Sequence, residues 1–600
     1  MTICPPPPPT LSTLPYDILR LIASHLPSAA SIANFAATST PLRSFVALEG
    51  WRVFVQVRFP SFHAEIVRES PPLQTADWRT WAQEQTLISR NWQRRGFVAR
   101  PLEPEISIHV PTGPRGRGRG GATTTTTTAT TTTATTRWAW TPGANRGGRQ
   151  TIRYSPVLDA YESVFFTGEA VVGVGAGPDL VLRKRTGAGK AIWWGFESRE
   201  DKAGRGDITA LQLLRPREKD GYGRGEVAVV GRANGKLEMV AMRTEGETAG
   251  RVGRVEVLQR YETGGLGVKS AALLHRGPAE MMVSVVLGTS GVALYRVRGP
   301  GGEAEAEAQA QAQAPVSEMV LADGEIPWMT TFLSPSLLAL GATSSAPLRV
   351  YAISSQEGIR GTPVRTFSAV ECAGVKTMGV YATAPLPTSI GSAENAGEVF
   401  LAGWYDGVSR LHDLRSPAQF VATYADPIDV QTPIYSLCPL GRQRFVVGGG
   451  RHCILKIFDL RMAGARVYDY LGDCNPPPPS PSPESPGWAT YLSPPVHRRT
   501  FTNAADWESP VYSLALAASG RSVFAGTQGR VWELGFGDAA VAAVAETPAW
   551  RDGGGARLTM YEFGWTGTMY RQGAESAMGT AGLEGGRMDG RWCATAMRAG

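Results

Sequence analysis

The residues that most often build metal and redox sites are present in this chain, but their spacing does not match such sites. The sequence has seven histidines without an HExxH pair or other metal-ligand spacing, namely His25, His63, His109, His275, His412, His452 and His497. Its six cysteines are scattered and form no CxxC pair: Cys4, Cys372, Cys438, Cys453, Cys474 and Cys593. This pattern argues against a zinc site or a disulfide scaffold and indicates a reducing compartment. We therefore expect no metal ligand in this chain.

Two glycine-rich segments do not match phosphate-binding loops. The segment GVGAG at 173–177 lies between strand-like residues and lacks the helix start that a dinucleotide site requires, so it predicts a hairpin turn. The segment GAGKA at 187–191 lacks the leading glycine of a phosphate loop, and Ala191 stands where that loop has Ser or Thr. The sequence thus predicts no catalytic residue and no cofactor, and we expect a protein that is not an enzyme.

Charge and hydropathy limit the kinds of partner. The segment GPRGRGRGG at 113–121 offers weak attraction to RNA, but the net charge of +7 is modest for 600 residues, so we interpret it as a solvated linker and expect no nucleic-acid partner. No apolar run reaches the roughly 18 residues of a membrane span. The start, MTICPPPPP, has neither the charged nor the apolar part of a signal peptide. We expect a cytoplasmic or nuclear location without membrane contact.

Residues 11–59 predict three short amphipathic helices. The first is expected to begin at Pro15, because the missing N–H of proline suits the first helical position, with Asp17 at the positive end of the helix dipole. One apolar stripe then follows helical spacing: Ile18, Leu19, Ile22 and Leu26. Pro27 is expected to end this helix and Ser28 to cap the second.

The second and third predicted helices continue this pattern. The second places three residues on one side: Ile32, Phe35 and Ala36. The third is expected to begin with a Thr40 cap and Pro41, followed by an inward set of Leu42, Phe45 and Val46. Trp51 and Phe54 complete this small helical unit. Roughly 45 residues cannot bury all of their apolar surface alone, so part of the stripe is expected to need another surface.

These residues resemble the F-box. The matching positions are Leu14-Pro15, Ile18-Leu19, Ile22, Leu26-Pro27, Phe35-Ala36-Ala37-Thr38-Ser39, Leu42-Arg43 and Trp51. The resemblance implies docking on the Skp adaptor of an SCF-type ubiquitin ligase, with a cullin recruited through Skp, in the manner of a helix in a groove. The residues expected to contact Skp are Leu14, Pro15, Ile18, Leu19, Ile22, Leu26, Pro27, Leu42, Phe45 and Trp51. The alternative is a helical cap whose stripe is buried within this chain.

Residues 75–97, TADWRTWAQEQTLISRNWQRRGF, predict one helix. Four large apolar side chains share one of its faces: Trp78, Trp81, Ile88 and Trp92. Such a stripe favours packing, and we expect this helix to fix the preceding helical unit against the rest of the protein.

From about residue 137 the sequence changes to short strands that recur at roughly 30–55 residues, the spacing of a propeller or solenoid. The clearest unit is 399–415, in which Tyr405-Asp406-Gly407 forms a tight turn between two strands. Asp406 is expected to bond to the backbone of its own hairpin. The other units fall at 163–184, 208–242, 271–297, 329–353, 434–461 and 511–536.

These units resemble the WD repeat, so a propeller of about seven blades is expected. Asp413 and Asp459 occupy the position of the aspartate in the Trp-Asp signature, and Trp532-Glu533 is a near match. His412 then stands where the signature has tryptophan and is expected to pack inside a blade. The segment order also resembles fungal F-box proteins with degenerate propellers, through 487–494, 509–536 and 558–564.

The expected fold is therefore an α+β multidomain protein with a small all-α F-box and an all-β propeller. The expected boundaries are a disordered Pro-rich lead at 1–10, the F-box at 11–60, a helical connector at 61–100, a low-complexity Gly/Arg/Thr linker at 101–136, the propeller at 137–570 with disordered insertions at 299–316 and 475–505, and a tail at 571–600. Residues 137–142 or 150–158 are expected to supply the strand that closes the ring.

The expected function is substrate recognition within an SCF-type ubiquitin ligase, with the F-box on Skp and an unknown target protein on the propeller. Two alternatives remain from the sequence. One is a Skp-binding scaffold that acts outside a ligase, and the other is a propeller hydrolase.

Overall fold

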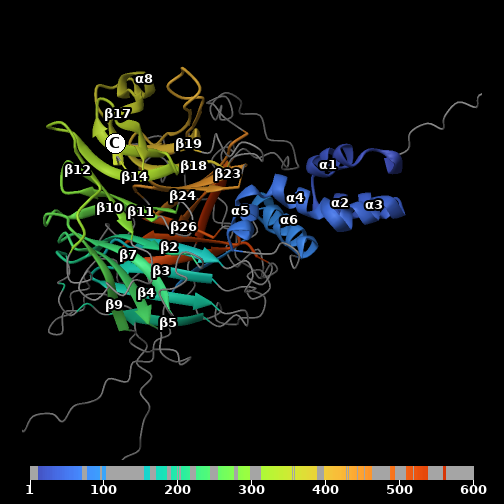
Figure 1. The fold of residues 1–600 in the computed structure, drawn as a ribbon, viewed down its shortest axis with the longest axis horizontal. Coiled ribbons are helices and arrows are strands. Elements are labelled where there is room, and N and C mark those ends of the chain that lie inside the picture. Colours follow the sequence, from blue (N-terminus) through green and yellow to red (C-terminus); the bar gives the residue numbers. More distant parts are fainter. Residues whose placement is uncertain are drawn as a thin grey trace, which may run out of the picture.

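The computed structural model describes residues 11–69, 77–94, 97–102, 154–162, 170–185, 191–196, 204–215, 225–243, 254–275, 281–297, 312–354, 358–387, 397–426, 432–441, 443–451, 453–461, 487–492, 509–517, 519–537 and 558–562, and residues 198, 201, 356 and 429. The predicted lead at 1–10, all but the first two residues of the linker predicted at 101–136, most of the insertion at 299–316 and the tail at 571–600 lie outside these ranges. Figure 1 shows a group of helices beside a large body of strands.

Seven α-helices occur in the described residues. They are α1 (Tyr16–His25), α2 (Ala29–Ala37), α3 (Thr40–Phe45), α4 (Trp51–Arg58), α5 (Pro60–Glu69), α6 (Trp78–Arg94) and α8 (Ala369–Ala373), with a 3-10 turn at Leu11–Thr13 and a π-helical turn at Val46–Gly50. Ser28 caps α2, as expected, by accepting the Ser31 N–H at 3.2 Å. Two predicted helix starts were wrong by one residue: Pro15 precedes α1, and the cap of α3 is Ser39 instead of Thr40.

The β body consists of antiparallel sheets. Four have four strands each: β2 (Val157–Glu162), β3 (Ala170–Ala176), β4 (Asp179–Arg185) and β5 (Ala191–Phe196); β6 (Ile208–Leu213), β7 (Glu226–Arg232), β8 (Leu237–Arg243) and β9 (Arg254–Tyr261); β10 (Val268–His275), β11 (Met281–Leu287), β12 (Gly291–Val297) and β13 (Ser317–Val320); and β26 (Val511–Leu516), β27 (Ser522–Thr527) and β28 (Arg530–Gly535) with β1 (Val98–Pro101).

A fifth sheet has five strands and a sixth has eight. The fifth contains β22 (Ile434–Leu440), β23 (Arg444–Gly449), β24 (Ile454–Asp459), β25 (Gly487–Leu492) and β29 (Leu558–Glu562). The sixth contains β14 (Ile326–Ser334), β15 (Leu337–Ser344), β16 (Leu348–Ser354), β17 (Gly358–Phe367), β18 (Met378–Pro385), β19 (Val399–Trp404), β20 (Ser409–Asp413) and β21 (Ala422–Tyr424).

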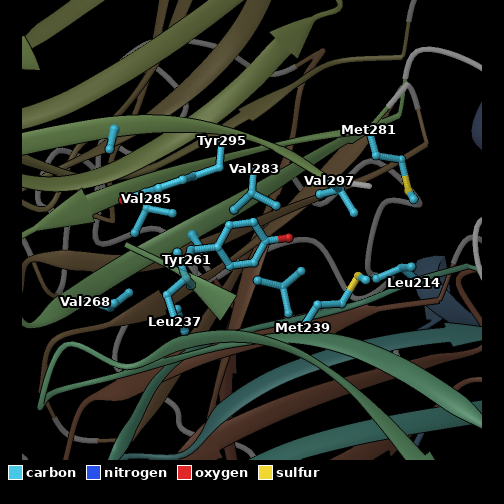
Figure 2. Close-up of a cluster of buried hydrophobic side chains, with 14 of the residues drawn as sticks. Leu214, Leu237, Met239, Tyr261, Val268, Met281, Val283, Val285, Tyr295 and Val297 are labelled. Atoms are coloured by element: carbon cyan, nitrogen blue, oxygen red, sulfur yellow. The ribbon is translucent and has the colours of Figure 1, made fainter. Parts of the chain in front are cut away.

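The sheets form a propeller-like ring. The first strand of each repeated unit lies against the first strand of the next in the order β2, β6, β10, β14, β18, β22 and β26, and β26 returns to β2. Neighbouring sheets pack face to face through apolar side chains. Figure 2 shows one such layer, in which Tyr261 lies between Met239 of one blade and Val283 of the next. The expectation of an all-β propeller is confirmed at this level.

The count of about seven separate blades differs from the structure. The ring has five blades of four or five strands and one sheet of double width. The wide sheet arises because β15 and β18 pair at Thr343↔Gly379 and Ser344↔Met378, so the hydrogen bonding of two four-stranded meanders is continuous. The sequence marks the strands but carries no signal for this lateral pairing.

The closing strand also differs from the expected one. β1 pairs with β28 from Val98↔Gly535 to Pro101↔Trp532, so residues 97–102 join the first part of the chain to the last blade. Residues 154–158 do not do this, because they lead into β2, the first strand of another blade, and residues 137–142 lie outside the described ranges. In addition, β25 falls within the insertion predicted at 475–505, where it pairs with β24.

Helix α6 connects the helices to the ring, as expected. Its first half packs Trp78 and Trp81 against the core of the helices. Its second half buries Ile88 and Trp92 among the strands of the last blades. In Figure 1, α5 and α6 accordingly lie next to the β body, and α1 to α3 extend away from it.

Candidate interaction surfaces

The residues predicted to contact Skp do not lie on one surface. Four of them are buried in the core of the helices, namely Leu19, Leu42, Phe45 and Trp51. Leu14, Ile22 and Leu26 are partly buried against the same core. Pro15, Ile18 and Pro27 are exposed. The buried residues can therefore shape a docking surface from beneath, but the exposed ones must make the contacts.

The exposed side of α1 is apolar. Ile18 is 42% exposed and Leu21 is 56% exposed, three residues apart and hence on one face of the helix. Leu11, just before α1, and Leu48, in the adjoining π-helical turn, are also exposed. We call Leu11, Ile18, Leu21 and Leu48 the apolar helix surface.

The opposite side of α1 holds this surface in place. Tyr16 packs edge-on against Phe45 with 5.1 Å between ring centroids, and Leu19 is only 4% exposed. The sequence did not predict Leu21 as a contact residue, because the resemblance to the F-box emphasises Leu19. The spacing of Leu14, Ile18, Leu21 and Ile22 was the available signal.

A second candidate surface lies on the ring. Six first strands carry a β-bulge near their start, and each bulge leaves one residue without a direct partner across the strand pair: Thr209, Lys269, Trp328, Tyr381, Tyr435 and Tyr512. All six are half-buried, whereas the residue before each one is buried. Because bulges redirect side chains, this repetition turns one residue per unit toward the same end of the ring.

Four of these bulge residues are aromatic, Trp328, Tyr381, Tyr435 and Tyr512, and the first three are in ring contact with one another through Tyr381. Tyr381 lies 5.2 Å from Trp328 and 5.2 Å from Tyr435 between ring centroids. Tyr405, in the turn between β19 and β20, is 49% exposed and lies 6.0 Å from Tyr381. We call Trp328, Tyr381, Tyr405, Tyr435 and Tyr512 the aromatic arc. Rigid aromatic side chains with a polar end are common energetic anchors of protein interfaces.

A cation borders the aromatic arc. The Lys269 ammonium lies 4.8 Å from the centroid of the Trp328 ring, in cation–π geometry. Burial lowers the pKa of Lys269. Burial therefore disfavours the charge, whereas the Trp328 ring face stabilises it, and the Lys269 ammonium lies at the edge of the aromatic arc.

The helices and the aromatic arc lie at opposite ends of the first strands. In β22, Tyr435 is near the start, whereas Leu440 at the end packs with Ile88 and Trp92 of α6. In β26, Tyr512 is near the start, and the turn after the strand contains Gly520, whose carbonyl accepts the Trp92 Nε1–H at 3.0 Å. The aromatic arc is therefore on the face of the ring away from the helices.

The residues at the predicted repeat signature act structurally. The Asp413 carboxylate accepts the backbone N–H of Arg415 at 3.0 Å, and Asp459 does the same for Arg461 at 2.9 Å, so each ends its strand with a turn. Glu533 is 1% exposed and forms an ion pair with Arg183 at 3.2 Å. His412 is fully buried, as expected.

The predicted turns also form. The Asp406 carboxylate accepts the backbone N–H of Val408 at 3.1 Å, and Gly407 has φ of +80°, which confirms the hairpin interpretation. Gly177, with φ of +62°, lies in the turn between β3 and β4. Residues 187–190 lie outside the described ranges.

The part of the chain that the structure describes contains neither a cluster of metal ligands nor a membrane-spanning helix. No group there brings three or more His, Cys, Asp or Glu side chains together as metal ligands. No helix in those ranges is both long and apolar enough to cross a membrane. Comparison with protein-family models and with curated proteins finds no match to this chain.

Proposed function

We propose that this protein is the substrate receptor of an SCF-type ubiquitin ligase. The observation that carries the proposal is the apolar helix surface, because neither the helical core nor the ring covers Ile18 and Leu21. Large apolar side chains that share one face of a helix suit insertion into a partner groove. The partner in this proposal is the Skp adaptor, through which a cullin is recruited.

The aromatic arc is the proposed binding surface for the target protein. It lies on the face of the ring away from the helices, so a target there and an adaptor on α1 do not compete for space. Helix α6 is packed into both parts and holds them in one arrangement. A receptor of this kind acts by bringing a target close to the ligase, and the rate gain comes from proximity. A cytoplasmic or nuclear location fits this role.

The test of the docking surface is a double charge substitution on α1, Ile18→Asp with Leu21→Asp, followed by pull-down of the purified Skp adaptor. Both side chains are exposed, so the fold is expected to persist, as checked by circular dichroism. We expect at least a 30-fold weaker affinity, since interface anchors contribute about 2 kcal/mol or more. Val421→Asp is the matched control, because Val421 is 55% exposed on the ring.

Unchanged adaptor binding by the double variant would remove the basis of the proposal. Adaptor binding without co-purification of a cullin would instead support a scaffold outside a ligase. The aromatic arc is tested in the same experiment with the double variant Tyr381→Ser and Tyr405→Ser. This variant should still bind the adaptor but should no longer co-purify target proteins. Val364→Ser, at another exposed apolar position, is the control for this double variant.

A further inference from the structure

A cleft of about 290 Å³ lies where the helices meet the ring. Its walls come from the end of α4, from α5 and α6, and from the turns after β22 and β26. Neither the apolar helix surface nor the aromatic arc contributes a residue to it. The cleft therefore offers a binding site that the proposed function does not use.

The charged residues that line the cleft are all positive. Three arginines line it, Arg58, Arg90 and Arg444, and no aspartate or glutamate is among its lining residues. Arg444 is only 9% exposed. Burial lowers the pKa of both Arg58 and Arg444, and the nearby Arg461 lowers each of them further. Placing like charges together in a partly buried space is costly unless an anion joins them.

A neighbouring carboxylate compensates only part of this charge. Asp459 attracts Arg444 but is already paired with Arg461, whose Nη2 lies 2.6 Å from Asp459 Oδ2. Arg58 Nη2 donates to the carbonyl oxygen of Pro27 at 3.2 Å, and this acceptor is neutral.

A buried neutral donor adds to the cationic groups. Gln85 on α6 lines the cleft and is 4% exposed, and its Nε2 has no hydrogen-bond partner among the described residues. An unsatisfied buried donor of this kind costs about 1–3 kcal/mol. Ser61 and Ser89 also line the cleft, whereas the Thr86 hydroxyl already donates to the Ala82 carbonyl oxygen at 2.7 Å. The lining is thus rich in donors and calls for a ligand that is rich in acceptors.

We propose that this cleft binds a phosphomonoester group. Guanidinium groups pair with phosphate oxygens through paired N–H donors, and phosphate offers the acceptors that Arg444, Arg58 and Gln85 need. The volume is near the lower limit of small-molecule sites, which suits a phosphate on a small organic group. The group comes either from a free phosphorylated small molecule or from a phosphorylated side chain. Because the site joins α4 and α6 to β23, the bound anion also strengthens the contact between helices and ring.

The experiment uses the full chain and inorganic phosphate as the probe. Isothermal titration calorimetry and thermal unfolding, compared with chloride at equal ionic strength, should show saturable binding and a raised melting temperature. Arg444→Gln and the exposed Arg90→Gln should each weaken phosphate binding at least 10-fold. Arg260→Gln, which removes the same charge on the surface of β9, should leave it unchanged.

Arg90→Gln and Gln85→Leu keep the test decisive where Arg444→Gln fails to fold, since Gln85→Leu removes the donor without changing the charge. The absence of saturable phosphate binding at millimolar concentration would overturn the proposal. So would equal binding by Arg90→Gln and Arg260→Gln. Competition by glycerol phosphate or by a phosphoserine peptide supports it, and the tighter competitor identifies the source of the phosphate.

Discussion

At the scale of the residue, His412 shows how burial inside a blade of the propeller-like ring changes the pKa of a side chain. Its imidazole is fully buried between Phe400, with ring planes at 22°, and Phe367, in edge contact at 4.4 Å. Its Nδ1–H donates to the carbonyl oxygen of Gln419 at 2.8 Å, which fixes the neutral tautomer. Burial lowers the pKa of His412 from 6.5 to about 3.

This pKa predicts that acid destabilises the fold through His412. Below about pH 6.5 the unfolded chain takes up a proton on this residue, whereas the folded chain does not until about pH 3. The free energy of unfolding should therefore fall by about 1.4 kcal/mol per pH unit across that window. Urea unfolding at about pH 7 and about pH 5 should differ by about 2 kcal/mol from this residue alone.

The control for this prediction is His412→Phe, which keeps an aromatic ring but cannot titrate. The variant is expected to lose some stability at neutral pH, because Gln419 loses its donor. Its stability should nevertheless fall less steeply between pH 7 and pH 5 than that of the parent. Equal slopes would mean that His412 is accessible to protons in the folded chain.

At the scale of the element, strand β1 joins the first part of the chain to the last blade. Leu102, directly after β1, donates its N–H to the carbonyl oxygen of Val531 at 2.8 Å and buries its side chain. We expect Leu102→Ala to lower the free energy of unfolding by about 2–5 kcal/mol. Leu102→Pro should lower it by a further 1–3 kcal/mol or so, because the buried acceptor on Val531 then loses its donor.

Chemical denaturation of the two variants separates the contribution of the Leu102 side chain to stability from that of the hydrogen bond between Leu102 and Val531. Leu102→Ala keeps the N–H and so reports the side chain alone. Equal stability of the alanine and proline variants would show that pairing at this end of β1 adds nothing to the ring.

The elements differ in how far the sequence predicts them. The α2 cap at Ser28 and the turn at Gly407 were predictable, because each depends on one side chain or one backbone conformation. β1 was not, because a four-residue strand beside a low-complexity segment shows too little alternation to be recognised. The pairing of β15 with β18 depends on contacts between units that no local pattern encodes.

The candidate surfaces, like the elements, could be predicted from the sequence only in part. Ile18 was predicted and is exposed, whereas Leu19 was predicted as a contact and is buried, since one helical stripe cannot tell the core from the partner side. The aromatic arc was not predicted at all. A bulge adds a residue to one strand only. The sequence around Tyr381 or Tyr435 does not reveal that a bulge forms there.

At the scale of the whole molecule, the contact between helices and ring decides whether two surfaces act as one receptor. That contact is concentrated at the end of α6. The Trp92 indole stacks on Phe536 with 3.6 Å between ring centroids and planes at 10°. Asn91 Nδ2 donates to the Phe536 carbonyl oxygen at 2.7 Å, and Glu84 forms an ion pair with Arg521. The phosphate cleft proposed above lies beside the same contact, since Trp92 is one of its lining residues.

Trp92→Ala is therefore expected to uncouple the two parts as well as to destabilise the chain, by about 3–5 kcal/mol. In the parent, far-ultraviolet circular dichroism of the helices and a fluorescent label on the ring should report a single unfolding transition. In the variant the helices should unfold at a lower urea concentration than the ring. Trp92→Phe keeps a ring against Phe536 but loses the hydrogen bond to Gly520 and part of the buried indole, so its two signals should stay coincident with a loss of about 1–3 kcal/mol. Coincident transitions in Trp92→Ala would show that the ion pair and Asn91 hold the parts together without the indole.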